Sequence, residues 1–211
     1  MFFLIAIVNL FKTYRVARVS GAIFNCAFFI VIASLFYLPM LLFLLPCFIA
    51  LFMLRSFRVI ERMQYILGAL AAIYLAFSLY FYFGLEQSFY VEYFTKNLKF
   101  PTVEGFKLSD MLPFGLVVIS LIVVIVNYYS LRKKKSIQSQ RKIDILYWFL
   151  LFSPLMLLFW YRLDYYGLLL TSVPLSILIG MILFRMKNQL IAELIHFLAL
   201  AALFVVHFDL L

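Results

Sequence analysis

Residues 21–54 contain no charged side chain, and this uninterrupted apolar stretch restricts the possible folds more than any other feature of the chain. A single helix over these 34 residues would be about 51 Å long. The hydrocarbon core of a bilayer is only about 30 Å thick. Two short membrane spans that meet near Tyr37, Leu38 and Pro39 fit better, because a proline is tolerated in the first turn of a helix.

The composition extends this interpretation to the whole chain. Of the 211 residues, 67% are hydrophobic and 13% are charged, whereas a soluble domain has about 45–50% apolar and about 25% charged residues. This excess excludes a soluble enzyme, a disordered tail and a nucleic-acid-binding domain. A membrane barrel would alternate polar and apolar residues. We therefore expect an all-α, polytopic transmembrane bundle, with residues 1–211 forming a single transmembrane domain.

The remaining apolar runs complete a set of about seven spans. They cover residues 64–85, 111–131, 145–161, 168–184 and 190–208. Gly68 and the nearby alanines, among them Ala72, predict a face where a second helix approaches closely. The first run, residues 1–11, is short for a span. It lies tilted in one leaflet, crosses a locally thinned bilayer, or belongs to a longer helix that begins before residue 1.

The basic residues predict the orientation of these spans. If every run crosses, 14 of the 18 Lys and Arg residues lie on one side, in clusters at 12–18, 55–62, 132–142 and 185–187. Basic clusters mark the cytoplasmic side of a membrane protein. The predicted topology therefore places loop 86–110 outside and the basic loop 132–144 on the cytoplasmic side. The start of the chain has no pattern of a cleavable signal peptide.

The long polar loop carries the first group of candidate site residues. In segment 86–98, Phe89, Tyr90, Tyr93 and Phe94 recur at helical spacing. This pattern predicts an amphipathic helix in the outer membrane interface. The helix either roofs a groove that binds lipid or substrate, or anchors the protein as part of an aromatic belt.

A second group lies in the short outer turn between two spans. Arg162 is positioned to hold a lipid phosphate, and Asp164 to pair with it or to orient a nucleophile. Tyr165 and Tyr166 follow directly. The alternative interpretation is a polar turn that only connects two helices.

Glu193 and His196 are the intramembrane polar candidates, and their spacing places them on one helix face. Ionisable groups within a membrane are candidates for function, but the position of Glu193 near the inner end of its span favours an ion pair with Arg185 or Lys187. His196 and His207 are about 16 Å apart on a helix, so they cannot share a metal. We expect neither a metal site nor another cofactor.

Two stretches resemble a known family. Residues 32–39, Ile-Ala-Ser-Leu-Phe-Tyr-Leu-Pro, and residues 159–174, from Phe-Trp-Tyr-Arg to Val-Pro, resemble a bacterial family of polytopic inner-membrane proteins of uncharacterised function. Its members are sometimes mislabelled as beta-carotene monooxygenases. The resemblance is to the C-terminal two-thirds of that family. It implies a location in the bacterial inner membrane, with loop 86–110 periplasmic, and it implies that the first run is the remnant of a helix whose upstream partners are missing.

The same hairpin is similar, more remotely, to the membrane core of GT-C glycosyltransferases, which use lipid-linked sugars. That resemblance implies an acidic residue in the first outer loop. The corresponding turn here is Tyr37-Leu38-Pro39, so the sequence argues against an intact glycosyltransferase.

The sequence therefore favours an accessory or scaffold subunit of a cell-envelope assembly over an enzyme. The alternatives are a degenerate lipid-linked glycosyltransferase or lipid-phosphate-binding protein, and a transporter. The expected partners are membrane lipids and proteins of an inner-membrane complex, and no nucleic acid. The tetrabasic run at 132–135 also suits contact with anionic lipid.

Overall fold

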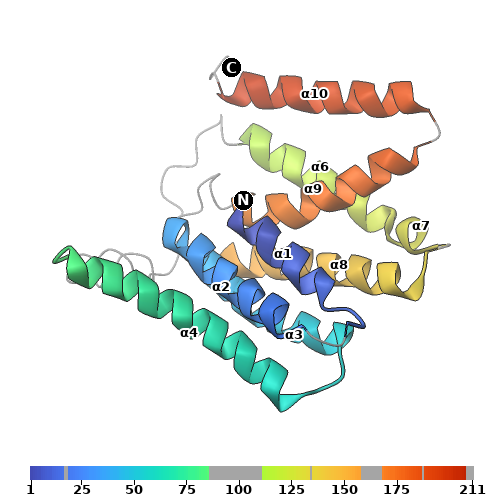
Figure 1. Ribbon diagram of the computed structural model, residues 1–211. Helices are drawn as coiled ribbons and strands as arrows, with labels where there is room; N and C mark the ends of the chain where they lie inside the picture. The colour runs from blue at the N-terminus through green and yellow to red at the C-terminus, as the bar shows by residue number, and fades with distance from the viewer. Residues whose placement is uncertain (17–18, 86–110, 134, 158–167, 187, 208–211) are drawn as a thin grey trace. The chain divides into compact units, whose positions relative to one another are not determined.

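The computed structural model describes residues 1–16, 19–85, 111–133, 135–157, 168–186 and 188–207. Most of these residues lie in helices, with no strand among them (Figure 1). The all-α class is therefore confirmed for the described part of the chain. The helices form two compact units: one comprises residues 1–102 and 147–161, the other residues 103–146 and 162–211.

The first unit contains the N-terminal helices and the second half of α8. Its elements are α1 (Phe2–Lys12), α2 (Ser20–Phe36), the 3₁₀ helix η1 (Leu38–Phe43), α3 (Leu44–Leu54), α4 (Val59–Tyr82) and the later residues of α8 (Ile137–Leu157). α1 buries Phe3, Ala6, Ile7 and Leu10, a spacing that forms one face of a helix. Phe3 meets Phe43 at 4.4 Å between ring centroids, and Phe149 of α8 lies 6.0 Å from Phe43. These rings join α1, η1 and α8 in one core.

The charge-free stretch is interrupted where the sequence predicts. α2 ends at Phe36, and Tyr37 is extended, with φ −148° and ψ 99°. Pro39 lies in the first turn of η1. The break is therefore confirmed, and Cys26 and Cys47 lie buried on either side of it.

α4 is the one described helix that is long and apolar enough to cross a membrane. It ends in a Schellman motif: the N–H of Leu85 donates to the carbonyl of Tyr80, and Gly84 has φ +67°, a left-handed conformation that favours glycine. The other apolar helices have shorter described lengths. The count of seven spans remains a prediction.

A close crossing of α2 and α4 confirms the predicted small-residue face. Gly68, Ala72 and Ala76 are buried, and their spacing of four residues places them on one face of α4. A Cβ atom added at Gly68 would overlap the backbone carbonyl of Phe24 in α2. No side chain fits at that point.

A buried arginine joins the ends of three segments of this unit. Arg55 Nε and Nη2 each donate to a carboxylate oxygen of Glu61, at 2.8 Å. Its Nη1 donates to the carbonyl oxygens of Thr13 and Val16, both at 2.7 Å. The C-terminal end of α1 is thus fixed to the α3–α4 junction. Asn9 Nδ2 donates to the carbonyl of Ile5 within α1, at 2.9 Å.

The second unit contains α6 (Met111–Val126), α7 (Tyr128–Arg132), the first part of α8, α9 (Leu168–Arg185) and α10 (Gln189–His207). α6 packs against α9, and α10 contacts α9. Several predicted boundaries were wrong. α8 begins at Ile137, eight residues before the expected span and within the expected loop 132–144, and the predicted span 111–131 is divided at Asn127.

Candidate functional site

The basic segment after α7 is held against the start of α8 by three side chains. Arg132 Nε lies 3.4 Å from Asp144 Oδ1. Arg132 Nη1 also donates to the hydroxyl of Tyr128 at 2.9 Å, and this hydroxyl donates to Asp144 at 3.1 Å. The charge of Arg132 is therefore compensated by an acidic partner and serves to position the segment.

The start of α8 is fixed by capping side chains. The hydroxyl of Ser136 accepts a hydrogen bond from the backbone N–H of Ser139 at 3.3 Å, as expected of an N-cap serine. Gln140 Nε2 donates to the carbonyl of Lys135 at 3.0 Å. The backbone next to Lys135 is thus ordered by local bonds, and its side chain extends from a defined position.

A cavity of about 560 Å³ lies beside this segment. Its lining consists of Leu131, Lys133, Lys135, Ile177, Gly180, Met181, Phe184 and Arg185. The five α9 residues among them recur at spacings of three and four, so they share one helix face. A Cβ atom added at Gly180 would meet nothing within 4 Å, which shows how open the cavity is at this position.

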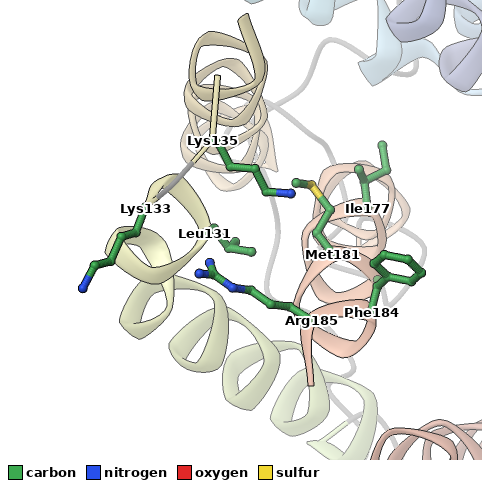
Figure 2. A pocket seen from close by; sticks show the side chains of 8 residues that line it. Leu131, Lys133, Lys135, Ile177, Met181, Phe184 and Arg185 are labelled. Carbon is green, nitrogen blue, oxygen red and sulfur yellow. The ribbon is translucent and has the colours of Figure 1, made fainter. Parts of the chain in front are cut away.

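Two of the three basic side chains are directed into the cavity. Figure 2 shows the Lys135 ammonium extending toward Met181 and the Arg185 guanidinium extending toward Leu131, whereas Lys133 points away. Arg185 Nη1 is also bonded to the carbonyl of Ser130 in α7. No acidic residue lines the cavity in the described part of the chain.

This arrangement has the chemistry of a site for an anionic amphiphile. Charge-assisted hydrogen bonds from arginine and lysine to phosphate are among the stronger polar contacts in proteins. Met181, Leu131 and Phe184 provide apolar surface next to the cations, and Phe184 is 95% exposed. A ligand with a phosphate and a hydrocarbon chain would use both parts of the lining.

The predicted outer-face site lies outside the described residues. This applies to the four aromatic residues of loop 86–110 (Phe89, Tyr90, Tyr93 and Phe94) and to the turn residues Arg162, Asp164, Tyr165 and Tyr166. Their grouping into a groove stays a prediction.

Glu193 and His196 are both exposed on α10. Arg185, one of the two expected partners of Glu193, bonds instead to Ser130, and no Glu193–Arg185 ion pair occurs. Lys187 lies outside the described residues. Among the residues described, no group of three or more His, Cys, Asp and Glu side chains is arranged to hold a metal.

The sequence did not predict that Lys135 and Arg185 line one cavity. A signal was present, because the positive-inside pattern assigns the clusters 132–142 and 185–187 to the same side. That pattern gives a side of the membrane and not a distance, so it could not identify which basic residues share a cavity.

Comparisons with known protein families, characterised proteins and solved structures find no match to the chain.

Proposed function

We propose that the chain is a multi-pass protein of the bacterial inner membrane, that it serves as an accessory subunit of an envelope assembly, and that its basic cavity binds the phosphate of an anionic lipid. The observation that carries the lipid-binding proposal is that Lys135 and Arg185 line one cavity together with the apolar side chains of Leu131, Met181 and Phe184. The cations would bind the anionic headgroup, and the acyl chain would pack against Phe184 and Met181.

The meeting of basic clusters within each unit supports the membrane topology. The positive-inside pattern assigns clusters 12–18 and 55–62 to one side, and Arg55 bonds to the carbonyls of Thr13 and Val16. It also assigns clusters 132–142 and 185–187 to one side, where Lys135 and Arg185 line the same cavity. Both contacts are expected if the helix ends that carry these basic clusters face the cytoplasm.

Exposed apolar surface supports a lipid environment. The outward face of α4 includes Leu67, Leu70 and Tyr74, with exposed fractions of 53%, 54% and 70%. On α10, Leu194 and Phe197 are also exposed. In water such surface would be a liability, whereas in a bilayer it contacts acyl chains.

The lipid proposal is tested by Lys135→Gln and Gly180→Leu in the purified protein. Removing one cation near the surface is expected to weaken binding of phosphatidylglycerol about fivefold, equivalent to about 1 kcal/mol. Gly180→Leu is expected to weaken it further by filling the cavity while leaving the helix intact. The measurement is the rise in melting temperature on adding phosphatidylglycerol, compared with phosphatidylcholine.

Two matched variants serve as controls. Lys12→Gln removes an exposed cation of another basic cluster, and Gly115→Leu adds the same side chain at a glycine that also has open space around its Cβ position. Neither is expected to change the lipid effect. Equal lipid responses in all four variants and the wild type would contradict the assignment of the cavity.

A further inference from the structure

The guanidinium of Arg62 is buried without a hydrogen-bond partner. Arg62 is only 4% exposed, and Nε, Nη1 and Nη2 all lack an acceptor among the described residues. An arginine side chain presents five N–H donors, and burying such groups unpaired is unfavourable. Arg62 therefore has unused capacity to bind an anion.

Aromatic rings, not acceptors, surround this guanidinium. Its central carbon lies 4.1 Å from the centroid of the Phe52 ring, and 5.6 and 5.8 Å from those of Phe48 and Phe57. Cations are attracted to ring faces, so the rings hold the guanidinium in place. The N–H groups at the edge of the guanidinium remain without a hydrogen-bond acceptor.

The neighbouring acid is already occupied. Glu61 accepts both bonds of the Arg55 fork at 2.8 Å, and it is also 4.0 Å from Arg58. The Glu61 carboxylate therefore already interacts with two arginines other than Arg62. The junction carries excess positive charge, and the charge of Arg62 has no acid of its own among the described residues.

We propose that Arg62 binds a phosphate oxyanion through its guanidinium edge, with Phe57 as a cover that moves aside. The phosphate comes from a phospholipid headgroup or from a soluble phosphate ester. A guanidinium fork matches two oxygens of a phosphate. This site lies in the first unit and is independent of the cavity lined by Lys135.

Phe57 has the position and exposure of a cover. It lies between α3 and α4, outside both helices, and it is 63% exposed. Its ring stacks on Phe52 with centroids 5.9 Å apart and an interplanar angle of 15°. Rotation of one exposed side chain would open a path to Arg62 without unfolding a helix.

The test compares Arg62→Met with Arg58→Met, both in a Lys135→Gln background that weakens the other lipid site. Arg58 is exposed and three residues from Glu61, so it matches the charge change at the same junction. The probes are phosphatidylglycerol in mixed micelles and, separately, glycerol 1-phosphate. The readout is binding affinity measured by the shift in melting temperature.

Arg62→Met is expected to weaken binding of the phosphate probe at least about tenfold, and Arg58→Met to change it less than about threefold. Arg62→Lys keeps the charge and loses the fork, so it is expected to fall between these values. It also provides a folded variant if the methionine variant is unstable. Binding of phosphatidylglycerol alone would identify a lipid headgroup site, and binding of both probes a general phosphate site.

Three results would overturn the proposal. The first is undiminished binding in both Arg62→Met and Arg62→Lys. The second is a wild-type protein that responds to neither probe. The third is that an acidic peptide of a partner protein occupies the site. Crosslinking from position 57 in membranes would detect this peptide, and neither probe would displace it.

Discussion

At the residue scale, Arg55 determines how the α3–α4 junction is built. Its side chain links Glu61 to the carbonyls of Thr13 and Val16, so it satisfies acceptors from two other segments at once. Glu61 lies in the first turn of α4, where a negative charge is favoured by the helix dipole. The sequence identified the charges that close this hairpin, but not the residue that pairs with Glu61.

Replacing Glu61 by Gln tests this link. Both side chains of the pair are less than a tenth exposed, and removing one partner of a buried ion pair costs about 3–5 kcal/mol. We therefore expect Glu61→Gln to lower the free energy of unfolding by about 3 kcal/mol, measured by denaturant titration in detergent.

Arg58→Gln is the control for this change. The Arg58 side chain is 63% exposed and its nitrogen lies 4.0 Å from Glu61, so its loss is expected to cost less than about 1 kcal/mol. Equal effects of the two variants would show that the Arg55–Glu61 pair adds nothing beyond surface charge.

At the element scale, the small-residue face of α4 was predictable because glycine and alanine at that spacing allow close packing. The helix that packs against this face, α2, could not be identified from the sequence, because α2 is apolar on all sides and no single contact face stands out.

The early start of α8 was missed for another reason. Charged residues were taken to end spans, although arginine, lysine and glutamine form helices well.

The interior proline of α8 shows how local chemistry compensates for a helix breaker. Pro154 has no N–H, so the carbonyl of Leu150 loses its usual partner. The hydroxyl of Ser153 donates to that carbonyl at 3.0 Å instead. The helix continues through the proline because a neighbouring side chain replaces the missing bond.

Gly68→Ala and Gly115→Ala are expected to have opposite effects on stability. Alanine stabilises a helix interior by about 1 kcal/mol relative to glycine, and the space around Gly115 is open. At Gly68 the added methyl group overlaps the backbone of Phe24, and overpacking of this kind costs about 1–3 kcal/mol. Melting temperatures of the two variants measure the difference.

The sign of the effect at Gly68 decides whether α2 and α4 cross at this point. A stabilised Gly68→Ala variant would mean that the two backbones are not in contact there.

At the scale of the whole molecule, the composition was sufficient to predict an all-α protein, whereas the charge pattern assigned the basic clusters to one side of the membrane and did not predict which of them meet within a unit. The outer-face groove depends on residues 86–110 and 158–167, which lie outside the described residues. The basic cavity was not predictable because it depends on the distance between the loop after α7 and the end of α9.

Single cysteines at positions 100 and 137 test the proposed topology in intact cells. Phe100 belongs to the predicted periplasmic loop, and Ile137, which is 64% exposed, follows the predicted cytoplasmic basic run. A membrane-impermeant thiol reagent is expected to label position 100 directly and position 137 only after permeabilisation. The native Cys26 and Cys47 are buried, so background labelling is expected to be low.

Labelling of both positions from the same side would contradict the proposed orientation. It would also remove the assignment of the basic cavity to the cytoplasmic leaflet.

The break at Tyr37 has a consequence for where such a protein resides. α2 has 17 residues, and its axial length is about 26 Å, shorter than a hydrocarbon core of about 30 Å. Under the proposed topology, a bilayer around the hairpin of α2 and α3 carries an energetic cost of hydrophobic mismatch that grows with the thickness of the bilayer. The protein is therefore expected to partition laterally into thinner regions of a membrane, so that acyl-chain length becomes a determinant of its distribution.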